Sequence, residues 1–390
     1  MTNRQLFLQH LAQTSTAPLA LEIVKAEGCQ LWDINGKKYI DLIGGISVAN
    51  IGHRHPKVID AINKQLEAYM HIMVYGELIQ SPQVQYARLL ADNLPSSLNT
   101  VYFTNSGAEA VEGAMKLAKR YTNRREIIAF KNSYHGSTQG ALSIIGDEYW
   151  RNAYRPLLPG IQHLNYNSFE DLLFITEQTA CVIAETIQAE AGIIVPQNGW
   201  LKALANRCTE TGTLLILDEI QTGFGRTGKL WGFEHFGITP DVVLLGKALG
   251  GGMPLGAFIT DKKIMDCLTD NPVLGHITTF GGHPVCCAAG MAAMNVLLEE
   301  NLILDIPAKL ELLKNLLVHP AIKNINSFGL WMAVEFASPQ HCKKVIDSCI
   351  DKGVLSDWFL FASSSLRISP PLTISHQQIE TAAKTILQSL

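Results

Sequence analysis

Short apolar runs alternate with longer helical patterns through the middle of the chain. Six runs have the length and composition of strands that are buried on both faces: residues 101–103, 127–130, 181–184, 214–217, 242–245 and 257–259. Helical stretches such as residues 108–121 and 200–211 lie between several of them. Strands that alternate with helices predict an α/β fold with a mainly parallel, doubly wound sheet, which we assign to a large domain at residues 46–282.

The pattern changes at both ends of this domain. An Ala- and Leu-rich helix runs from residue 283 to residue 300, and shorter apolar segments follow at 330–336 and 366–368. These predict a smaller α+β domain at residues 283–390. Residues 1–45 include LWDINGKKYIDL, in which Asn35 and Gly36 separate two apolar runs as in a β-hairpin. We expect this N-terminal segment to pack with the small domain, so that the large domain is a central insertion.

Composition and charge exclude several classes of protein. The 390 residues include 31 Lys and Arg against 35 Asp and Glu, a formal net charge of -4. This balance gives no electrostatic case for binding nucleic acid, which needs concentrated positive charge. No stretch approaches the roughly 18 uninterrupted apolar residues of a membrane span, and the N-terminus lacks the pattern of a signal peptide. We therefore expect a cytoplasmic protein without a membrane partner.

The low fraction of charged residues indicates an oligomer. It is 17%, whereas roughly 25% is usual for soluble domains, so a partner subunit is expected to cover part of the surface. The eight cysteines show no CxxC pair and no metal-ligand spacing, and several lie in apolar runs. We therefore predict that the cysteines are reduced core residues. His53 and His55 in GHRHP lack supporting ligands, so we predict no metal site.

Two glycine-rich segments resemble nucleotide-binding motifs but lack their context. GFGRTG at residues 223–228 has GxGxxG spacing, yet five residues separate it from the preceding strand and no helical pattern follows. Gly246 and Lys247 lack the earlier glycine and the following Ser or Thr of a P-loop. Neither segment therefore predicts a nucleotide site.

A better anion site is TNSGAEAVEGAMKLAKR at residues 104–120, where a strand ends and a helix begins. Ser106, Gly107 and Ala108 are small, so a phosphate could approach the free N–H groups and the positive end of the helix dipole. A plain capped helix without a ligand is the alternative.

The most informative residues are Lys247 and Asp218, which both follow buried strands. Lys247 stands just after the run at 242–245, where loss of hydration would favour a neutral, nucleophilic amine. Ligands bind at the carboxyl edge of open α/β sheets, so both side chains should face the crevice of the predicted phosphate site. Taken alone, Lys247 could be a solvated lysine, and Asp218 could be a helix cap or half of a salt bridge. Together they suit pyridoxal phosphate (PLP), which needs a lysine, a carboxylate and a phosphate site.

These motifs identify a resemblance to the class-III PLP-dependent aminotransferases, the group of acetylornithine, ornithine and 4-aminobutyrate aminotransferases. The similarity runs from GGISVANIGHRHP at residues 44–56 to LRISPPL at residues 366–372. It implies the fold type I architecture, PLP as cofactor, and transfer of an amino group from an amine donor to an oxo acid. An ω-amino group of an ornithine- or acetylornithine-like donor and 2-oxoglutarate are the substrates that it favours.

The resemblance also implies a role for each matching residue. Lys247 resembles the lysine that forms the Schiff base, and Asp218 the partner of the pyridine nitrogen. The remaining cofactor contacts would come from Ser106, Gly107 and Ala108 at the phosphate, Tyr134 stacked on the ring, Gln221 at the phenolic oxygen, and His135 and Glu185 in the pocket wall. Thr279 in HITTFGGHP is similar to the threonine that reaches the phosphate of the neighbouring subunit, which implies a homodimer with shared active sites.

Glu190 and Arg367 look like a switch pair. In the family such an arginine binds the α-carboxylate of the acceptor and is otherwise held by the glutamate. A bidentate guanidinium parked on a carboxylate can be masked for one substrate and exposed for the next. A surface salt bridge is the alternative that residue order alone leaves open.

The chain departs from the family at Ser137 in YHGST, where these aminotransferases commonly carry an arginine that grips a substrate carboxylate. We hypothesise that Arg151 or Arg155 binds the distal group of the donor instead, or that the donor has no carboxylate there. Thr186 and Ala189 replace the usual Pro and Gly of the EPIQGE pattern.

Two other functions are compatible with the same scaffold. An aminomutase or a decarboxylase would use the same cofactor on a different bond, and Glu190 with Arg367 favours transamination over both. A non-catalytic binding protein is disfavoured by the joint presence of Lys247, Asp218, Gln221 and Thr279.

Overall fold

The six apolar runs form strands of one seven-stranded sheet in a computed structural model that describes residues 1–390. The strand order is β4-β10-β9-β8-β7-β5-β6. The strands are β4 (Thr100–Thr104), β5 (Glu126–Phe130), β6 (Ile161–Leu164), β7 (Thr179–Glu185), β8 (Leu214–Asp218), β9 (Val242–Leu245) and β10 (Gly256–Thr260). The pairs from β6 to β9 are parallel, and β10 is antiparallel to both of its neighbours. The predicted mainly parallel sheet is confirmed.

Both faces of this sheet are buried, because successive residues of each strand enter different hydrophobic clusters. In β8, Leu215 and Leu217 belong to one cluster, and Leu214 and Ile216 to the other. Helix α5 (Gly107–Thr122) packs in the second cluster, whereas α8 (Trp200–Thr211) and α10 (Pro284–Glu299) pack in the first. A charged side chain inside such a strand would lose its hydration on either face. Charges therefore occur where the strands end.

Strand β6 was not among the predicted strands. It lies at the edge of the sheet and pairs only with β5, and its Gln162 is exposed while His163 is half-buried. An edge strand needs no continuous apolar run, so its sequence carries a weaker signal than those of the central strands.

The N-terminal strands pair with the C-terminal part of the chain. Strands β1 (Ile23–Glu27), β2 (Gln30–Asp33) and β3 (Lys38–Asp41) are antiparallel, and Gly36 turns between β2 and β3 with φ 79°. The predicted hairpin is thus present. Strand β13 (Val354–Leu355) joins β3 in parallel. The domain boundaries after residues 45 and 282 remain a prediction.

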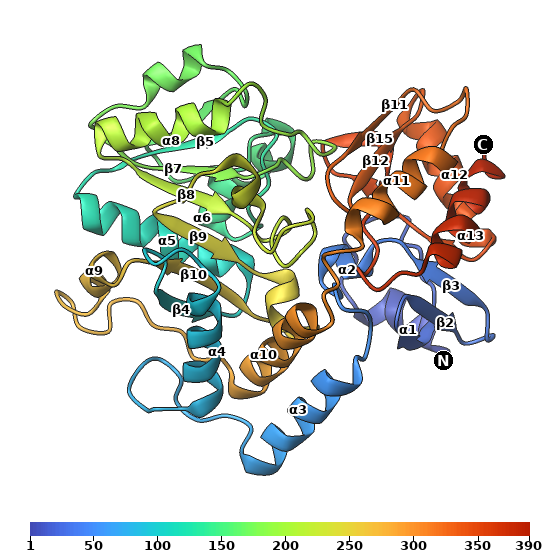
Figure 1. Ribbon diagram of the computed structural model, residues 1–390, viewed down its shortest axis with the longest axis horizontal. Helices are drawn as coiled ribbons and strands as arrows, with labels where there is room; N and C mark the ends of the chain where they lie inside the picture. The colour runs from blue at the N-terminus through green and yellow to red at the C-terminus, as the bar shows by residue number, and fades with distance from the viewer.

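A third sheet has the order β11-β12-β15-β14 and is wholly antiparallel. Its strands are β11 (Asn324–Ser327), β12 (Met332–Glu335), β14 (Trp358–Phe359) and β15 (Ala362–Ile368). The longer helices near it are α11 (Ile306–Leu316), α12 (Pro339–Asp351) and α13 (His376–Leu387). Both termini lie in this part of the molecule, to the right of the seven-stranded sheet in Figure 1.

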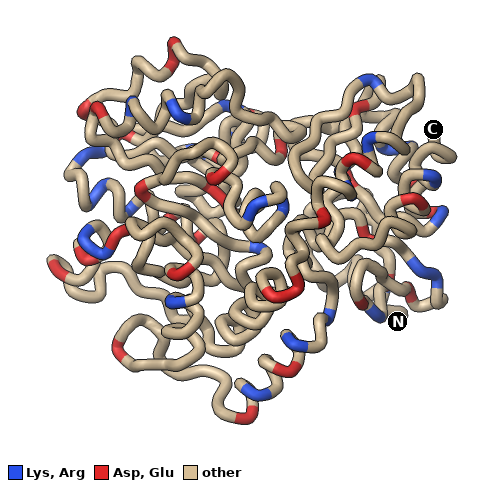
Figure 2. The backbone as a smooth tube through the Cα atoms, in the orientation of Figure 1, with Lys and Arg blue, Asp and Glu red and all other residues tan.

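The remaining helices are mostly short or lie at the periphery. They are α1 (Asn3–His10), α2 (Gly44–Ser47), α3 (Pro56–Ala68), α4 (Ser81–Asp92), α6 (Gln139–Ser143), α7 (Glu148–Arg151) and α9 (Lys262–Met265). None of the helices combines the length and the apolar composition that crossing a membrane would require. Figure 2 shows acidic and basic residues intermixed over both parts of the molecule.

A buried arginine connects the two parts. The Arg226 side chain is fully buried and donates hydrogen bonds to the carbonyl oxygens of Leu330 and Pro370, both at 2.7 Å, and to Asn50 Oδ1 at 2.7 Å. It contacts no carboxylate, and burial lowers the pKa of its guanidinium to about 9. Arg226 therefore joins a loop after β8 to the segment before α3, the turn between β11 and β12, and the segment after β15.

Replacing Arg226 should loosen this junction. We expect Arg226→Met to lower the free energy of unfolding by about 3 kcal/mol, because three buried acceptors lose their donor. Chemical denaturation with circular dichroism measures the change. Arg88→Met is the matched control, because Arg88 is exposed and pairs only with Asp92 one turn away, and it should change stability by less than about 0.5 kcal/mol. Equal effects of the two substitutions would contradict the role of Arg226.

Candidate active site

The carboxyl ends of β7 and β8 bring two acidic residues side by side. Glu185 and Asp218 are register partners in adjacent parallel strands, and both are buried. Asp218 Oδ2 lies 2.7 Å from His135 Nδ1, and its Oδ1 accepts a hydrogen bond from the Ile220 N–H at 2.9 Å. The carboxylate of Asp218 is thus held at both oxygens by neighbours that fix its direction.

Glu185 organises the loop that carries Tyr134. Its Oε1 accepts a hydrogen bond from the Tyr134 N–H at 2.9 Å, and its Oε2 accepts one from the Ala189 N–H at 2.8 Å. Burial raises the pKa of Glu185 well above its usual range, and the nearby charge of Asp218 acts in the same direction. The Tyr134 hydroxyl lies 3.2 Å from Ser137 Oγ, so Ser137 is an immediate neighbour of this ring.

The start of α5 forms a small cradle beside these acids. Ser106 is the N-cap residue, and its Oγ accepts a hydrogen bond from the Glu109 N–H at 3.2 Å. A Cβ atom on Gly107 would lie 2.6 Å from Ile220 Cδ1, so a larger residue there would require the Ile220 side chain to move. The first N–H groups of a helix have no partners within it and carry partial positive charge. The cradle therefore suits an anion such as phosphate.

Lys247 comes directly after the turn that follows β9 and opens a short 3₁₀ helix, Lys247–Gly250. Its φ is 47°, in the left-handed region that costs a non-glycine residue energy. Its Nζ makes no hydrogen bond or ion pair with any other residue. Burial lowers the pKa of Lys247, although the charge of Asp218 opposes this shift. The site therefore favours the neutral form of this amine more than water does.

Most of these residues line one cavity of about 310 Å³, and Ser106 is not among them. Its walls include eight of the residues that the sequence predicted for the cofactor: Gly107, Ala108, Tyr134, His135, Glu185, Asp218, Gln221 and Lys247. Ser137, Ile187, Ile220 and Thr222 also line it and were not predicted as cofactor contacts. Three buried polar atoms of this wall have no hydrogen-bond partner: His135 Nε2, Gln221 Oε1 and Thr222 Oγ1.

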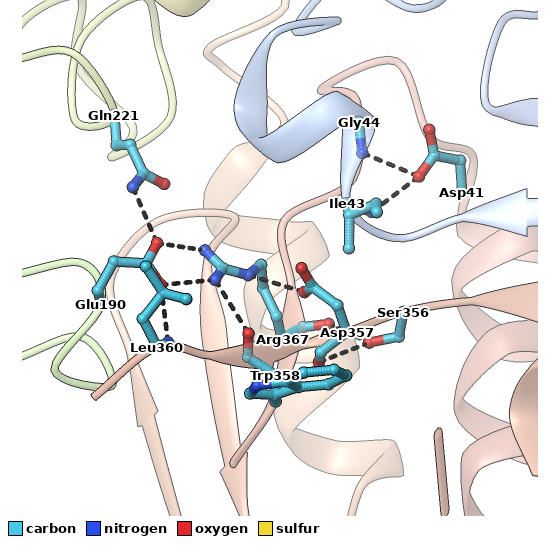
Figure 3. Close-up of polar contacts among 10 residues, drawn as sticks. All are labelled: Asp41, Ile43, Gly44, Glu190, Gln221, Ser356, Asp357, Trp358, Leu360 and Arg367. Carbon is cyan, nitrogen blue, oxygen red and sulfur yellow. Dashed lines mark hydrogen bonds and ion pairs between the residues drawn. The ribbon is translucent and has the colours of Figure 1, made fainter. Parts of the chain in front are cut away.

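A second cavity of about 390 Å³ shares Tyr134, Gln221 and Lys247 with the first. Glu190 and Arg367 lie in its wall as a buried ion pair (Figure 3). Arg367 Nη1 donates to Glu190 Oε1 at 2.9 Å, and Nη2 donates to Oε2 at 2.8 Å. The pair is therefore bidentate and internal, and it is not a surface salt bridge. The attraction of Arg367 lowers the pKa of Glu190 against the effect of burial.

Asp357 also contacts Arg367 and was missed in the sequence. Arg367 Nε donates to Asp357 Oδ1 at 2.8 Å, and Figure 3 shows the guanidinium between Glu190 and Asp357. Trp358, Leu360 and Ile46 complete this wall. The sequence offered no signal for Asp357 beyond its place ten residues before Arg367, because a turn brings the two together.

Four predicted or considered residues line neither cavity: Ser106, Thr279, Arg151 and Arg155. Thr279 is exposed and lines neither cavity of this chain. Arg151 Nε donates to Glu148 Oε2 at 2.8 Å, and Arg155 Nε donates to Glu148 Oε1 at 3.0 Å. Neither arginine lines the two cavities, so the structure gives no support to their predicted role as substrate ligands.

Comparison with known proteins finds the same architecture in proteins of one family. The sequence model described as aminotransferase class-III matches residues 11–390. An acetylornithine aminotransferase of Methanopyrus kandleri is 39% identical over 388 residues, which cover 98% of this chain and 96% of that protein. A [LysW]-aminoadipate semialdehyde/glutamate semialdehyde transaminase of Sulfurisphaera tokodaii is 38% identical over 370 residues, or 93% of each chain.

Solved structures agree with this result. The ornithine aminotransferase of Toxoplasma gondii, whose structure is described with partial occupancy of PLP at the active site, superimposes with a TM-score of 0.91. The two chains are 31% identical, and the match covers 99% of this chain and 92% of that one.

Lys247 should react with electrophiles at lower pH than an ordinary lysine. A lowered pKa leaves more neutral amine near pH 7, so we expect a small aromatic aldehyde with cyanoborohydride to modify Lys247 of the ligand-free protein before other lysines. Lys64 is the internal control, because its ion pair with Asp60 raises its pKa. Peptide mass spectrometry across pH 6 to 10 measures both rates. If Lys247 became reactive only at the same pH as Lys64, or at a higher pH, the lowered pKa of Lys247 would be contradicted.

Proposed function

The chain belongs to the class-III aminotransferase family, and on that premise we propose that it moves the ω-amino group of an ornithine- or acetylornithine-like donor to 2-oxoglutarate. The family is PLP-dependent, so the chain is a PLP-dependent aminotransferase of fold type I. The donor, the oxo acid and the role of each residue are our proposal. The observation that carries it is the buried pair of Glu190 and Arg367 in a cavity that also reaches Lys247.

The first cavity fits PLP. The cradle at Gly107 offers free N–H groups to a phosphate, and its glycine lets a ligand approach the backbone closely. The unpaired Gln221 Oε1 and Thr222 Oγ1 are buried polar atoms that a bound polar molecule would satisfy. When bound, PLP supplies an aldehyde for covalent attachment and an electron-withdrawing ring that stabilises negative charge on a neighbouring carbon.

Lys247 and Asp218 would perform the central tasks. The neutral Nζ of Lys247 can attack a carbonyl carbon, and it can later accept and return a proton beside the donor carbon. Asp218 would keep the ring nitrogen protonated through a charge-assisted hydrogen bond. His135 at 2.7 Å and the Ile220 N–H at 2.9 Å hold that carboxylate in place.

The surrounding residues would orient the cofactor. The Tyr134 ring would stack on it, because its backbone N–H is fixed on Glu185 and its side chain lines both cavities. Gln221 would bind the phenolic oxygen, since its amide lies in both walls and its Nε2 is 3.3 Å from Glu190 Oε1. Gln221 thereby links the cofactor site to the substrate site.

Glu190 and Arg367 would let one cavity accept two kinds of substrate. While Glu190 occupies the guanidinium, the cavity presents no free cation to a carboxylate, which suits an approaching ω-amino group. When Glu190 withdraws, the Nη1 and Nη2 edge can bind the α-carboxylate of 2-oxoglutarate in the same bidentate geometry. The buried position strengthens each interaction relative to water.

Ser137 bears on the distal group of the donor. It replaces the arginine that the family resemblance leads one to expect, and Arg151 and Arg155 are paired with Glu148. The guanidinium that lines the second cavity is that of Arg367. We therefore favour a donor whose distal end is held by hydrogen bonds from groups such as Ser137 and the Tyr134 hydroxyl.

A homodimer is part of the proposal. Thr279 is exposed in the single chain, as a residue that reaches into a partner's site would be. Its neighbours Ile277 and Phe280 are exposed apolar residues, and Ile79 is 94% exposed. Such apolar surface is usual at subunit interfaces.

The reaction can be tested one half at a time. Adding acetylornithine, ornithine or a simple diamine to the PLP-loaded protein without any oxo acid should change the cofactor absorbance and release the matching aldehyde. Subsequent 2-oxoglutarate should restore the spectrum and yield glutamate. Lys247→Ala should slow the donor step by roughly 10³-fold or more, because it removes the amine that is proposed to transfer the proton.

Lys202→Ala is a suitable control for loss of a lysine, because Lys202 is an exposed residue of α8. It should behave like the wild type. Release of carbon dioxide in place of the aldehyde would instead identify a decarboxylase. Absence of any spectral change with all three amines would contradict the proposed donor class.

Removing the charge of Glu190 should strengthen the binding of the acceptor, 2-oxoglutarate. We expect Glu190→Gln to lower the KM for 2-oxoglutarate about fivefold, because an amide competes less well than a carboxylate for Arg367. The same variant should accept glutamate more readily as an amino donor. Stopped-flow measurements of each half-reaction give these constants. An unchanged KM for 2-oxoglutarate would show that Glu190 does not mask Arg367.

A further inference from the structure

Arg367 is held by more groups than the predicted switch pair requires. Its Nη atoms bind Glu190, its Nε donates to Asp357 Oδ1 at 2.8 Å, and Nη2 also lies 3.2 Å from the Trp358 carbonyl oxygen. The guanidinium carbon is 4.3 Å from the centre of the Phe359 ring, a cation–π distance. Asp357, Trp358 and Phe359 are consecutive, so one short segment makes three contacts with the guanidinium, and Figure 3 shows Asp357 across it from Glu190.

The two carboxylates occupy different edges of the guanidinium. Glu190 accepts from Nη1 and Nη2, the edge that can bind a substrate carboxylate in a bidentate fashion. Asp357 accepts only from Nε. A substrate carboxylate therefore has to displace Glu190 but can leave Asp357 in place.

Glu190 is itself tied to several groups. Its Oε2 accepts a hydrogen bond from the Leu360 N–H at 3.0 Å, and its Oε1 accepts one from Gln221 Nε2 at 3.3 Å. If the Arg367 side chain were free to follow Glu190, the bidentate edge would turn away from the cavity. An anchor at Nε that is independent of Glu190 prevents this.

The charge of Asp357 contributes little to the exchange. It repels the Glu190 carboxylate and an incoming carboxylate to a similar extent, because both occupy the same Nη edge. The orienting effect of Asp357 on Arg367 does differ between the two bound states. It is needed only when the substrate carboxylate replaces Glu190. Pre-ordering a binding group lowers the entropy that binding must overcome.

We propose that Asp357 is a positioning residue that keeps the Nη1 and Nη2 edge of Arg367 directed into the substrate cavity while a dicarboxylate substrate replaces Glu190. This inference rests on the proposed function, because it assigns the α-carboxylate of the acceptor to Arg367. It makes the two carboxylates on one arginine act in opposite directions. Glu190 weakens the binding of the acceptor, and Asp357 strengthens it.

The test compares removal of the anchor with removal of its charge alone. Asp357→Ala removes the Nε acceptor, whereas Asp357→Asn keeps an oxygen at the same position without the charge. Asp347→Asn is the control for loss of a carboxylate, because Asp347 is exposed on α12 and pairs only with Lys343. Each PLP-loaded variant is titrated calorimetrically with glutarate, which has the two carboxylates of 2-oxoglutarate but no carbonyl to react.

We expect Asp357→Ala to weaken glutarate binding and to raise the KM for 2-oxoglutarate, both by roughly fivefold to tenfold, while the maximal rate of the acceptor half-reaction changes little. Asp357→Asn should recover most of the wild-type affinity, and Asp347→Asn should match the wild type. Glu190→Gln should shift both constants in the opposite direction. Should Asp357→Ala lower the unfolding temperature markedly, Asp357→Ser serves as the removal variant, because its hydroxyl is too short to reach Nε.

Tighter or unchanged glutarate binding in Asp357→Ala would overturn the inference, since Asp357 would then compete like Glu190 or play no part. Equal losses in Asp357→Asn and Asp357→Ala would also overturn it, because charge and not orientation would be responsible. The donor half-reaction separates this failure from that of the proposed function. If the wild type reacts with the amine donors but the Asp357 variants bind glutarate normally, the proposed function stands and only the role of Asp357 fails.

Discussion

The active site depends on the loss of hydration inside the central sheet. Strands β7, β8 and β9 are buried on both faces, so no charge can lie within them without losing its contact with water. Their first charged residues come where the strands end or just beyond, at Glu185, Asp218 and Lys247. Because the strands are parallel and adjacent, these ends meet at one edge. The exclusion of charge from the buried strands thereby places these ionisable residues together at one edge of the sheet.

The same burial sets the chemistry of that edge. It lowers the pKa of Lys247 and raises the pKa of Glu185, so the amine is directed towards its neutral form and the acid towards its protonated form. Asp218 is held in a fixed direction by His135 and by the Ile220 N–H. One cavity therefore places a lysine of lowered pKa beside two buried carboxylates.

The second cavity combines residues from the C-terminal part of the chain with residues from the large sheet and its loops. Arg367 lies on β15, opposite Ala333 of β12, whereas Glu190 comes from a loop after β7. The cavity that they line is formed by segments far apart in the sequence, and the buried Arg226 contributes three hydrogen bonds to the junction of the two parts.

The sequence by itself determined the central sheet and the residues at its carboxyl edge, because continuous apolar runs leave few alternatives for a strand and because Lys247 and Asp218 end two of them. It missed β6, whose edge position needs no apolar run, and it missed Asp357, whose contact with Arg367 depends on a turn. It also suggested Arg151 and Arg155 as substrate ligands, since a sequence does not show that Glu148 lies within reach of both. The tertiary structure alone decided that Glu190 and Arg367 are buried together, because a salt bridge between residues so far apart in the chain follows from packing and not from local pattern.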